Sequence, residues 1–373
     1  MRNLVCFLLT FWVVACSQPK KPHPEESLSS DTIRYAQGFT VHHFNDYTSV
    51  DVRDPWDSTR LLQRYLLVDR EKPVPGNLPK GTVVRVPVQN IVVYTSVHAA
   101  VIDQLGETGR IIGVCEPRYM DTPSVQEGLK AGRIADMGEA TAPNVELMID
   151  KGAELVLVSP FQNSGYGPVE KLGIPIIEGA DYMESLPLGR TEWIRFYGML
   201  FGKEAKADSI FRVTEKSYLD LKELVTADMP RPSVISEKKF GSSWFMPSGE
   251  SYVANLYKDA GADYIFTDLP GAGSTPLAFE TVLDRAIHAD LWLIKYNQSK
   301  DMTYGNLHSE YTPYENFDAF KNRRIYACNT GVVPYYEEFP LHPDYLLKDL
   351  IWVFHPELLP DYTPRYYHKM QEE

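Results

Sequence analysis

The chain has 373 residues and a formal net charge of −13, from 50 acidic against 37 basic residues. An acidic surface of this kind argues against binding to nucleic acid and against electrostatic adhesion to anionic lipid. The length is enough for two lobes with a buried core each. Aromatic residues make up 12% of the chain, which suits an organic ligand and core packing equally well.

The first sixteen residues predict export and lipid anchoring. A short basic start precedes an apolar run over 4–14, which is too short to span a bilayer as a permanent helix. The following Ala15-Cys16 resembles the end of the lipobox of bacterial lipoproteins, in which the cysteine is acylated and becomes the first residue. We therefore expect a signal peptide over 1–15, then lipidated Cys16 and a disordered tether over 16–31, on the periplasmic face of a bacterial membrane. An ordinary secretory signal is the alternative.

Residues 32–187 predict a first lobe. Runs with strand character come first, and from Gly81 onward strands and helices alternate. This alternation predicts a mostly parallel sheet with helices on both faces, hence an α/β fold. The predicted strands lie at 39–41, 49–52, 65–68, 91–94, 110–115, 154–159 and 174–177, and a helix at 96–105.

Residues 188–229 predict helices between two lobes. One helix is expected over 188–201, ending at Gly202, and a second over 204–225, where apolar residues recur every three or four positions. The second would be about 33 Å long. We interpret it as a rigid strut joining the lobes, with a long surface helix of a single domain as the alternative.

Residues 230–373 predict a second lobe of similar build. Strands are expected at 233–236, 290–294 and 324–328, and helices at 251–260 and 344–354. Two segments share one pattern. Residues 146–158 and 280–294 each consist of a predicted amphipathic helix that begins with a glutamate, a short turn and an apolar strand. The repeat favours two lobes of the same topology.

The cysteine and histidine spacing predicts neither a metal site nor a cofactor site. Cys115 and Cys328 are far apart in the chain and fall on different lobes, so we expect two buried free thiols, with one disulfide as the alternative. No histidines have metal-ligand spacing. Because nucleophile-elbow, P-loop and dinucleotide motifs are also missing, we do not expect an enzyme.

Four segments together resemble the substrate-binding proteins of ABC importers. They are 138–158, 196–206, 249–262 and 317–326, and their order and spacing match over nearly the whole mature chain. The class resembled is the TroA-like one, whose lobes are joined by a rigid helix and which binds ferric siderophores, cobalamin or haem. The resemblance implies a ferric siderophore as first candidate ligand and cobalamin as second. An exported enzyme or chelatase on the same scaffold, and a scaffolding or adhesive lipoprotein, are the alternatives.

The same resemblance implies a monomer that docks onto an ABC permease–ATPase complex. In that class one glutamate on each lobe meets arginines of the permease, and the matching residues here are Glu146 and Glu280. A carboxylate accepts the planar guanidinium fork of arginine in a bidentate way. The alternative is that both are solvated first-turn carboxylates favoured by the helix dipole.

A ligand of such a two-lobed protein is expected between the lobes, beyond the carboxyl ends of the parallel strands. The loop at 238–246 combines cations with adjacent aromatics and could hold a flat, partly anionic chelate. The candidate ligand-binding residues are Tyr94, Ser96, Arg118, Tyr119 and Phe161 in the first lobe and Lys239, Trp244, Phe245, Tyr296 and Tyr335 in the second.

Overall fold

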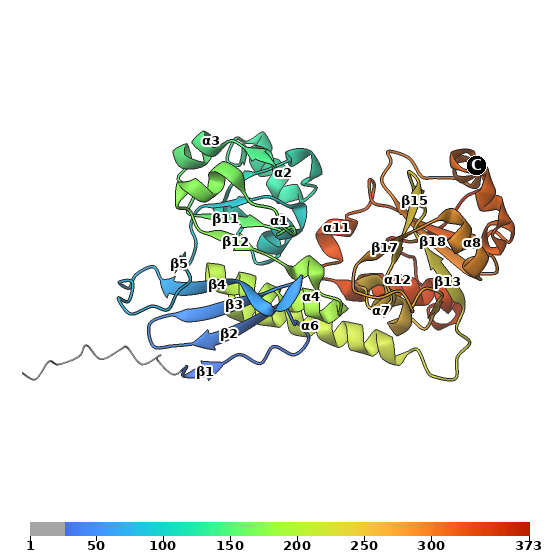
Figure 1. Ribbon diagram of the computed structural model, residues 1–373, viewed down its shortest axis with the longest axis horizontal. Coiled ribbons are helices and arrows are strands. Elements are labelled where there is room, and N and C mark those ends of the chain that lie inside the picture. Colours follow the sequence, from blue (N-terminus) through green and yellow to red (C-terminus); the bar gives the residue numbers. More distant parts are fainter. Residues whose placement is uncertain (1–26) are drawn as a thin grey trace, which may run out of the picture.

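The computed structural model describes residues 27–373, which form two lobes, each built around a parallel sheet (Figure 1). The predicted signal peptide, Cys16 and most of the predicted tether lie outside the described residues. Within 27–373, no helix combines the length and the apolar character that crossing a membrane requires. The α/β fold with two lobes is confirmed.

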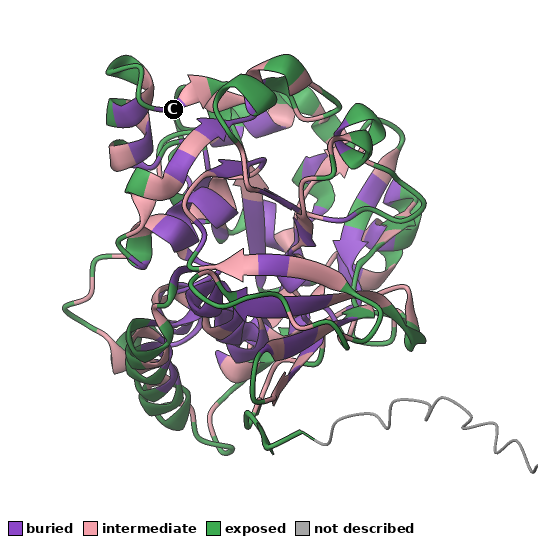
Figure 2. Ribbon diagram, turned by 90° about the vertical axis from the view of Figure 1, so that its left-hand side faces the viewer, coloured by how far each residue is buried: buried purple, intermediate pink, exposed green. Residues whose placement is uncertain are grey.

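The first lobe contains a parallel sheet in the order β12-β11-β6-β7-β8. Successive side chains alternate between two cores, because Ile91 and Val93 pack on one face while Val92 and Tyr94 pack on the other. The strands are β6 (Ile91–Val93), β7 (Ile111–Val114), β8 (Ala135–Asp136), β11 (Leu155–Val158) and β12 (Ile176–Glu178), flanked by α1 (Ser96–Gln104), α2 (Pro123–Lys130) and α3 (Val145–Asp150). Figure 2 shows the buried strands inside and the exposed helices and loops outside.

The second lobe repeats this topology. Its sheet has the order β16-β13-β18-β19-β20, so β19-β18-β13-β16 has the same chain order as β12-β11-β6-β7. The strands are β13 (Ser233–Ser236), β16 (Asp263–Tyr264), β18 (Leu291–Tyr296), β19 (Ile325–Asn329) and the antiparallel β20 (His368–Lys369). The main helices are α7 (Tyr252–Asp259), α8 (Phe279–Ala286), α11 (Tyr335–Glu338) and α12 (Pro343–Phe354). The repeat seen in the sequence is therefore confirmed as a shared topology.

Each lobe also has a mostly or wholly antiparallel sheet. The three runs predicted before Gly81 are strands of the sheet β1-β2-β3-β4-β5, which packs on the interlobe helices through contacts such as Phe39 against Trp193, with ring centroids 5.0 Å apart. Its strands are β1 (Ser29–Ser30), β2 (Phe39–His43), β3 (Thr48–Asp54), β4 (Asp57–Asp69) and β5 (Thr82–Val86). In the second lobe, the segment expected to be a loop forms a hairpin instead, because β14 (Lys239–Phe240), β15 (Ser243–Pro247) and β17 (Ser274–Leu277) pair in one sheet.

Three helices lie where the two lobes join. The single helix expected over 188–201 is broken at Trp193 into α4 (Pro187–Glu192) and α5 (Ile194–Phe201). The long α6 (Glu204–Glu223) contributes Phe211 to the core of the first lobe and Tyr218 to that of the second. Since one continuous helix belongs to both cores, it acts as the strut expected from the sequence.

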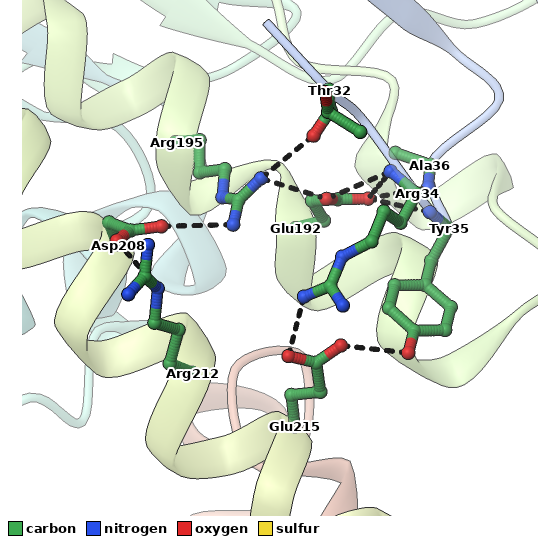
Figure 3. Close-up of polar contacts among 9 residues, drawn as sticks. All are labelled: Thr32, Arg34, Tyr35, Ala36, Glu192, Arg195, Asp208, Arg212 and Glu215. Carbon is green, nitrogen blue, oxygen red and sulfur yellow. Dashed lines mark hydrogen bonds and ion pairs between the residues drawn. The ribbon is translucent and has the colours of Figure 1, made fainter.

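The segment before β2 is fastened to these helices by buried carboxylates (Figure 3). Glu192 is fully buried and accepts the backbone N–H groups of Arg34 at 3.1 Å, Tyr35 at 2.7 Å and Ala36 at 3.0 Å. Glu215 on α6 accepts the guanidinium of Arg34 at 2.6 Å and the hydroxyl of Tyr35 at 2.7 Å. The segment that leads into β2 is therefore held against the interlobe helices.

Cys115 and Cys328 are both buried and both free, which confirms the prediction of two free thiols. Burial raises the pKa of each thiol to about 12. Each is therefore protonated and inert at neutral pH.

Candidate ligand-binding face between the lobes

The carboxyl ends of the two parallel sheets face each other where α1 meets α11. Helix α1 begins directly after β6, α11 follows β19, and the two helices contact each other across the lobes. Figure 1 shows α11 between the lobes, beside α1. Glu337 of α11 lies within hydrogen-bonding reach of Ser96 and close to the charge of Asp121, both on the first lobe. We call the loops that follow the carboxyl ends of the parallel strands in both lobes the interlobe face.

Exposed aromatic side chains gather on the interlobe face. Tyr119 and Phe161, which follow β7 and β11, are 58% and 64% exposed. On the second lobe, Phe240 and Phe245 follow β13, Tyr336 follows β19, and all three are exposed. Exposed rings on both lobes suit a ligand with a large flat or apolar periphery.

The backbone is strained on the same face. Glu116, Asn163 and Glu237 have φ angles of 50°, 57° and 64°, although none is a glycine. They follow β7, β11 and β13 directly or after a few residues. Residues held in this left-handed region cost free energy and concentrate at binding sites, so their position supports a functional role for the interlobe face.

The cations of the interlobe face are engaged within their own lobes. The guanidinium of Arg118 pairs with Glu139 at 2.6 Å and lies 3.6 Å from Glu116. In the second lobe, Lys295 pairs with Glu237. The face therefore offers paired rather than free positive charges.

Glu337 is the carboxylate held between the lobes. Burial raises its pKa, the hydrogen bond with Ser96 acts in the opposite direction, and the charge of Asp121 raises it further. Glu337 is therefore a partly desolvated carboxylate that interacts with residues of both lobes.

Five of the sequence-predicted residues lie accessible on this face. They are Ser96, which contacts Glu337, and Arg118, Tyr119, Phe161 and Phe245. The Arg118 guanidinium stacks over the Tyr119 ring, 4.8 Å from its centroid. Tyr296 is half-buried, and its hydroxyl accepts the backbone N–H of Met302 at 2.7 Å, so it holds the loop after β18.

The structure corrects the expectation for Trp244 and Tyr335. Trp244 has no exposed surface, donates its indole N–H to the Ser236 carbonyl at 2.9 Å, and packs on Trp292. Tyr335 is buried against Phe339, with ring centroids 4.6 Å apart. Neither ring has a face left for a ligand, because β15 and α11 turn these side chains into the core of the second lobe.

Lys239 and Tyr94 are also not positioned as the sequence predicted for ligand-binding residues. The Lys239 ammonium lies 4.9 Å from the centroid of the Tyr311 ring and donates to the Gly241 carbonyl. Tyr94 is buried at the end of β6, yet its hydroxyl has no hydrogen-bond partner among the described residues. An unpartnered buried hydroxyl is costly, so a donor or acceptor from outside the chain would be favourable there.

The predicted set of ligand-binding residues leaves out Asp121, Tyr336 and Glu337, although it contains Tyr119 and Tyr335 from the same two segments. The signal available was the run of two glutamates after a pair of tyrosines at 335–338. That α11 would bring Glu337 to Ser96 could not be read from either segment alone.

A cavity of about 1020 Å³ lies elsewhere, between the β2–β3 turn and α5–α6. The charged side chains that line it pair with one another: Asp208 binds both Arg195 at 2.9 Å and Arg212 at 2.8 Å (Figure 3). Arg34 is likewise held by Glu215. This cavity therefore belongs to the junction of the N-terminal sheet with the interlobe helices.

Residues 91–330 match the family described as periplasmic binding protein. The chain belongs to the periplasmic binding protein family. The match covers both parallel sheets except for β20 and includes every aromatic of the interlobe face up to β19. As a member of this family of ABC binding proteins, the chain is a substrate-binding protein and not an enzyme.

Relatives of this periplasmic binding protein agree with that assignment. An uncharacterized lipoprotein of Methanocaldococcus jannaschii is 27% identical over 95% of this chain and 92% of its own length. The ABC-type Fe3+-hydroxamate transport system structure from Saccharomonospora viridis is 17% identical, with a TM-score of 0.56 over 72% of this chain and 94% of that chain. A TroA-like periplasmic binding protein from Veillonella parvula is 16% identical, with a TM-score of 0.57 over 78% and 97%. These two structures show a shared fold.

Glu146 and Glu280 occupy equivalent places in the two lobes of the binding protein. Each is exposed in the first turn of a helix, α3 and α8, and each helix leads into a strand of equivalent position, β11 and β18. Neither forms an ion pair with a residue in the described range 27–373. Both carboxylates are thus free to meet a cationic partner.

No group of three or more histidine, cysteine, aspartate or glutamate side chains within 27–373 is placed to hold a metal ion.

Proposed function

We propose that this binding protein captures a metal chelate of the iron(III)-siderophore type between its two lobes and delivers it to the permease of an ABC transporter. The observation that carries the proposal is the interlobe face, where exposed rings follow the carboxyl ends of strands in both lobes and α1 contacts α11. Aromatic walls fit a large chelate with an organic periphery better than a bare ion.

Similar structures support this choice of ligand. The structure from Saccharomonospora viridis is described as an Fe3+-hydroxamate transport system, and one from Staphylococcus epidermidis as a possible iron-binding protein. Another of the same fold, from Roseiflexus, is described as haem-binding, with a TM-score of 0.51. Cobalamin and haem therefore belong beside ferric siderophores in the test.

The test is direct binding to the purified mature protein. Ferric trihydroxamate, ferric tricatecholate, cyanocobalamin and haemin are each added in excess, and the absorbance that co-elutes with the protein is measured after gel filtration. At least one chelate is expected to co-elute at a one-to-one ratio. If none is retained, capture of a metal chelate is refuted.

We propose further that Glu146 and Glu280 dock onto arginines of the permease. The two carboxylates sit on lobes held by one rigid helix, so their separation is fixed and can match two sites on a partner. Reversing both charges, Glu146→Arg with Glu280→Arg, should abolish uptake of the chelate in cells and leave binding by the purified protein unchanged.

The matched control reverses two exposed carboxylates of α6, Glu204→Arg with Glu223→Arg. Its net charge changes equally, and both uptake and binding should stay as in the wild type. Normal uptake by the Glu146/Glu280 double variant would exclude docking through these residues.

We also propose that the protein is exported and held at a membrane through lipid on Cys16. The support is the lipobox-like sequence together with relatives described as lipoproteins. Those relatives come from an archaeon, so the bacterial membrane expected from the sequence stays a prediction. Metabolic labelling with a fatty acid, compared between the wild type and Cys16→Ala, tests the anchor.

A further inference from the structure

The charges on the interlobe face bear on which chelates it accepts. Most cations close to it already have a partner in their own lobe, and Lys300, exposed in the loop after β18, forms no ion pair with a described residue. Arg118 forms ion pairs with two carboxylates, Glu116 and Glu139, and Lys295 forms an ion pair with Glu237. In the hairpin, Lys238 pairs with Glu310 at 2.5 Å and Lys239 lies on the Tyr311 ring.

Two carboxylates of the face have no such partner. Asp121 on the first lobe and Glu337 on the second form no ion pair with any residue that the structure describes, yet they lie close enough for the Asp121 charge to act on Glu337.

An incoming anion would find Arg118, Lys238 and Lys295 already paired with carboxylates and would meet Asp121 and Glu337 from opposite lobes. In a partly desolvated space, a charge at about 7 Å changes affinity by about tenfold. The exposed rings act in the same sense, because the face of an aromatic ring attracts a cation and disfavours an anion. Tyr119, Phe161 and Tyr336 supply such faces on both lobes.

On the basis of the proposed function, we infer that the interlobe face selects chelates without net negative charge, neutral or cationic, and rejects anionic ones. The sequence alone predicted the opposite preference, because the Lys238-Lys239 pair beside aromatic residues suggested binding of a partly anionic chelate. On folding, Lys238 pairs with Glu310 and Lys239 lies against the Tyr311 ring, so both lysines are less available to an anionic ligand.

The test compares chelates of different charge at equal ionic strength. A ferric trihydroxamate that carries a protonated amine and neutral cyanocobalamin represent the accepted class, and a ferric tricatecholate, with three negative charges, represents the rejected one. At least one of the first two should bind with an affinity at least 100-fold above that of the tricatecholate. Tighter or equal binding of the tricatecholate would overturn the inference and leave chelate capture intact.

Charge-removing variants separate this electrostatic cause from shape. The double variant Asp121→Asn with Glu337→Gln should narrow the preference between cationic and anionic chelates by about tenfold or more. Glutamine at 337 keeps an oxygen that accepts from Ser96, so the contact between the lobes is retained. Glu223→Gln at the far end of α6, with the same side-chain change, should leave the preference unaltered.

An unchanged preference in the double variant would overturn the inference even if the tricatecholate binds poorly. If no chelate of any charge binds, the proposed function fails and the selectivity inference fails with it. The two failures are therefore distinguished by whether any chelate is retained.

Discussion

A buried carboxylate, Asp181, holds together the elements beneath the interlobe face. It accepts hydrogen bonds from His98 Nε2 at 3.0 Å, from the Tyr197 hydroxyl at 2.8 Å and from Arg190 Nε at 3.1 Å. The Arg190 guanidinium also lies over the Phe339 ring of the second lobe, 4.9 Å from its centroid. One charged cluster therefore joins α1, α4 and α5 and extends to the second lobe.

This cluster predicts a specific acid sensitivity. Burial alone would raise the pKa of Asp181, but the hydrogen bond from His98 and the charge of Arg190 outweigh burial and bring the pKa to about 2. Because the folded-state pKa lies below the unfolded value of about 3.9, the carboxylate stabilises the fold above about pH 4. That contribution, about 2 kcal/mol, is lost as the pH falls from about 4 to about 2.

The measurement is the free energy of unfolding against pH for the wild type and Asp181→Asn. The variant should be less stable at pH 7, and the difference between the two proteins should shrink between about pH 4 and pH 2. Asp361→Asn, a change at an exposed aspartate, serves as the control. A constant difference between wild type and Asp181→Asn over this range would contradict the assignment.

At the scale of elements, α6 decides how the lobes are joined. Its first half packs with Phe211 in one core and its second half with Tyr218 in the other, while Val213 between them is 68% exposed. A helix interrupted at this point would leave both cores filled but would remove the rigid connection.

We expect Val213→Pro to break α6 and separate the lobes without unfolding either one. Proline removes a backbone hydrogen bond and costs about 3 kcal/mol in a helix interior. Small-angle scattering should show a larger radius of gyration, and far-ultraviolet circular dichroism only a modest loss of helix. Val213→Ala removes the same exposed side chain and should leave both signals unchanged. Scattering of Val213→Pro identical to that of the wild type would exclude a strut role for α6.

At the scale of the whole molecule, the two lobes share buried structure. Leu341 from the second half of the chain packs in the core of the first lobe, and Leu188 packs in the core of the second. Such exchange, together with the helix common to both cores, favours lobes that unfold together.

The two buried thiols, one per lobe, can report this cooperativity. In a chain that begins at Ser17, Cys115→Ala leaves a probe in the second lobe and Cys328→Ala a probe in the first. Because both thiols are buried and have a pKa of about 12, a disulfide reagent at pH 8 should label them only after unfolding, and at equal rates. Much faster labelling of one thiol under native conditions would show that its lobe opens by itself.

Adjacent residues illustrate the limit of prediction from the sequence. Trp244 and Phe245 were both predicted to contact a ligand, but neighbouring side chains of a strand point to opposite faces, so Trp244 is buried and Phe245 is exposed. The segment was not recognised as a strand because its partner, β17, lies almost thirty residues further along the chain. In the same way, the Lys238 charge depends on Glu310, which is distant in sequence.

The sequence by itself determined most strands and helices of the two parallel sheets, the long interlobe helix, the internal repeat and the expectation of two free thiols, and four of its segments carried the resemblance to binding proteins. The strands, helices and repeat follow from periodicity and turn residues, which are local properties of the chain. Only the tertiary structure decided which rings remain exposed, which cations are already paired, and that Glu337 meets Ser96. Burial and ion pairing depend on contacts between distant segments, so the character of the binding face emerges only when the lobes are assembled.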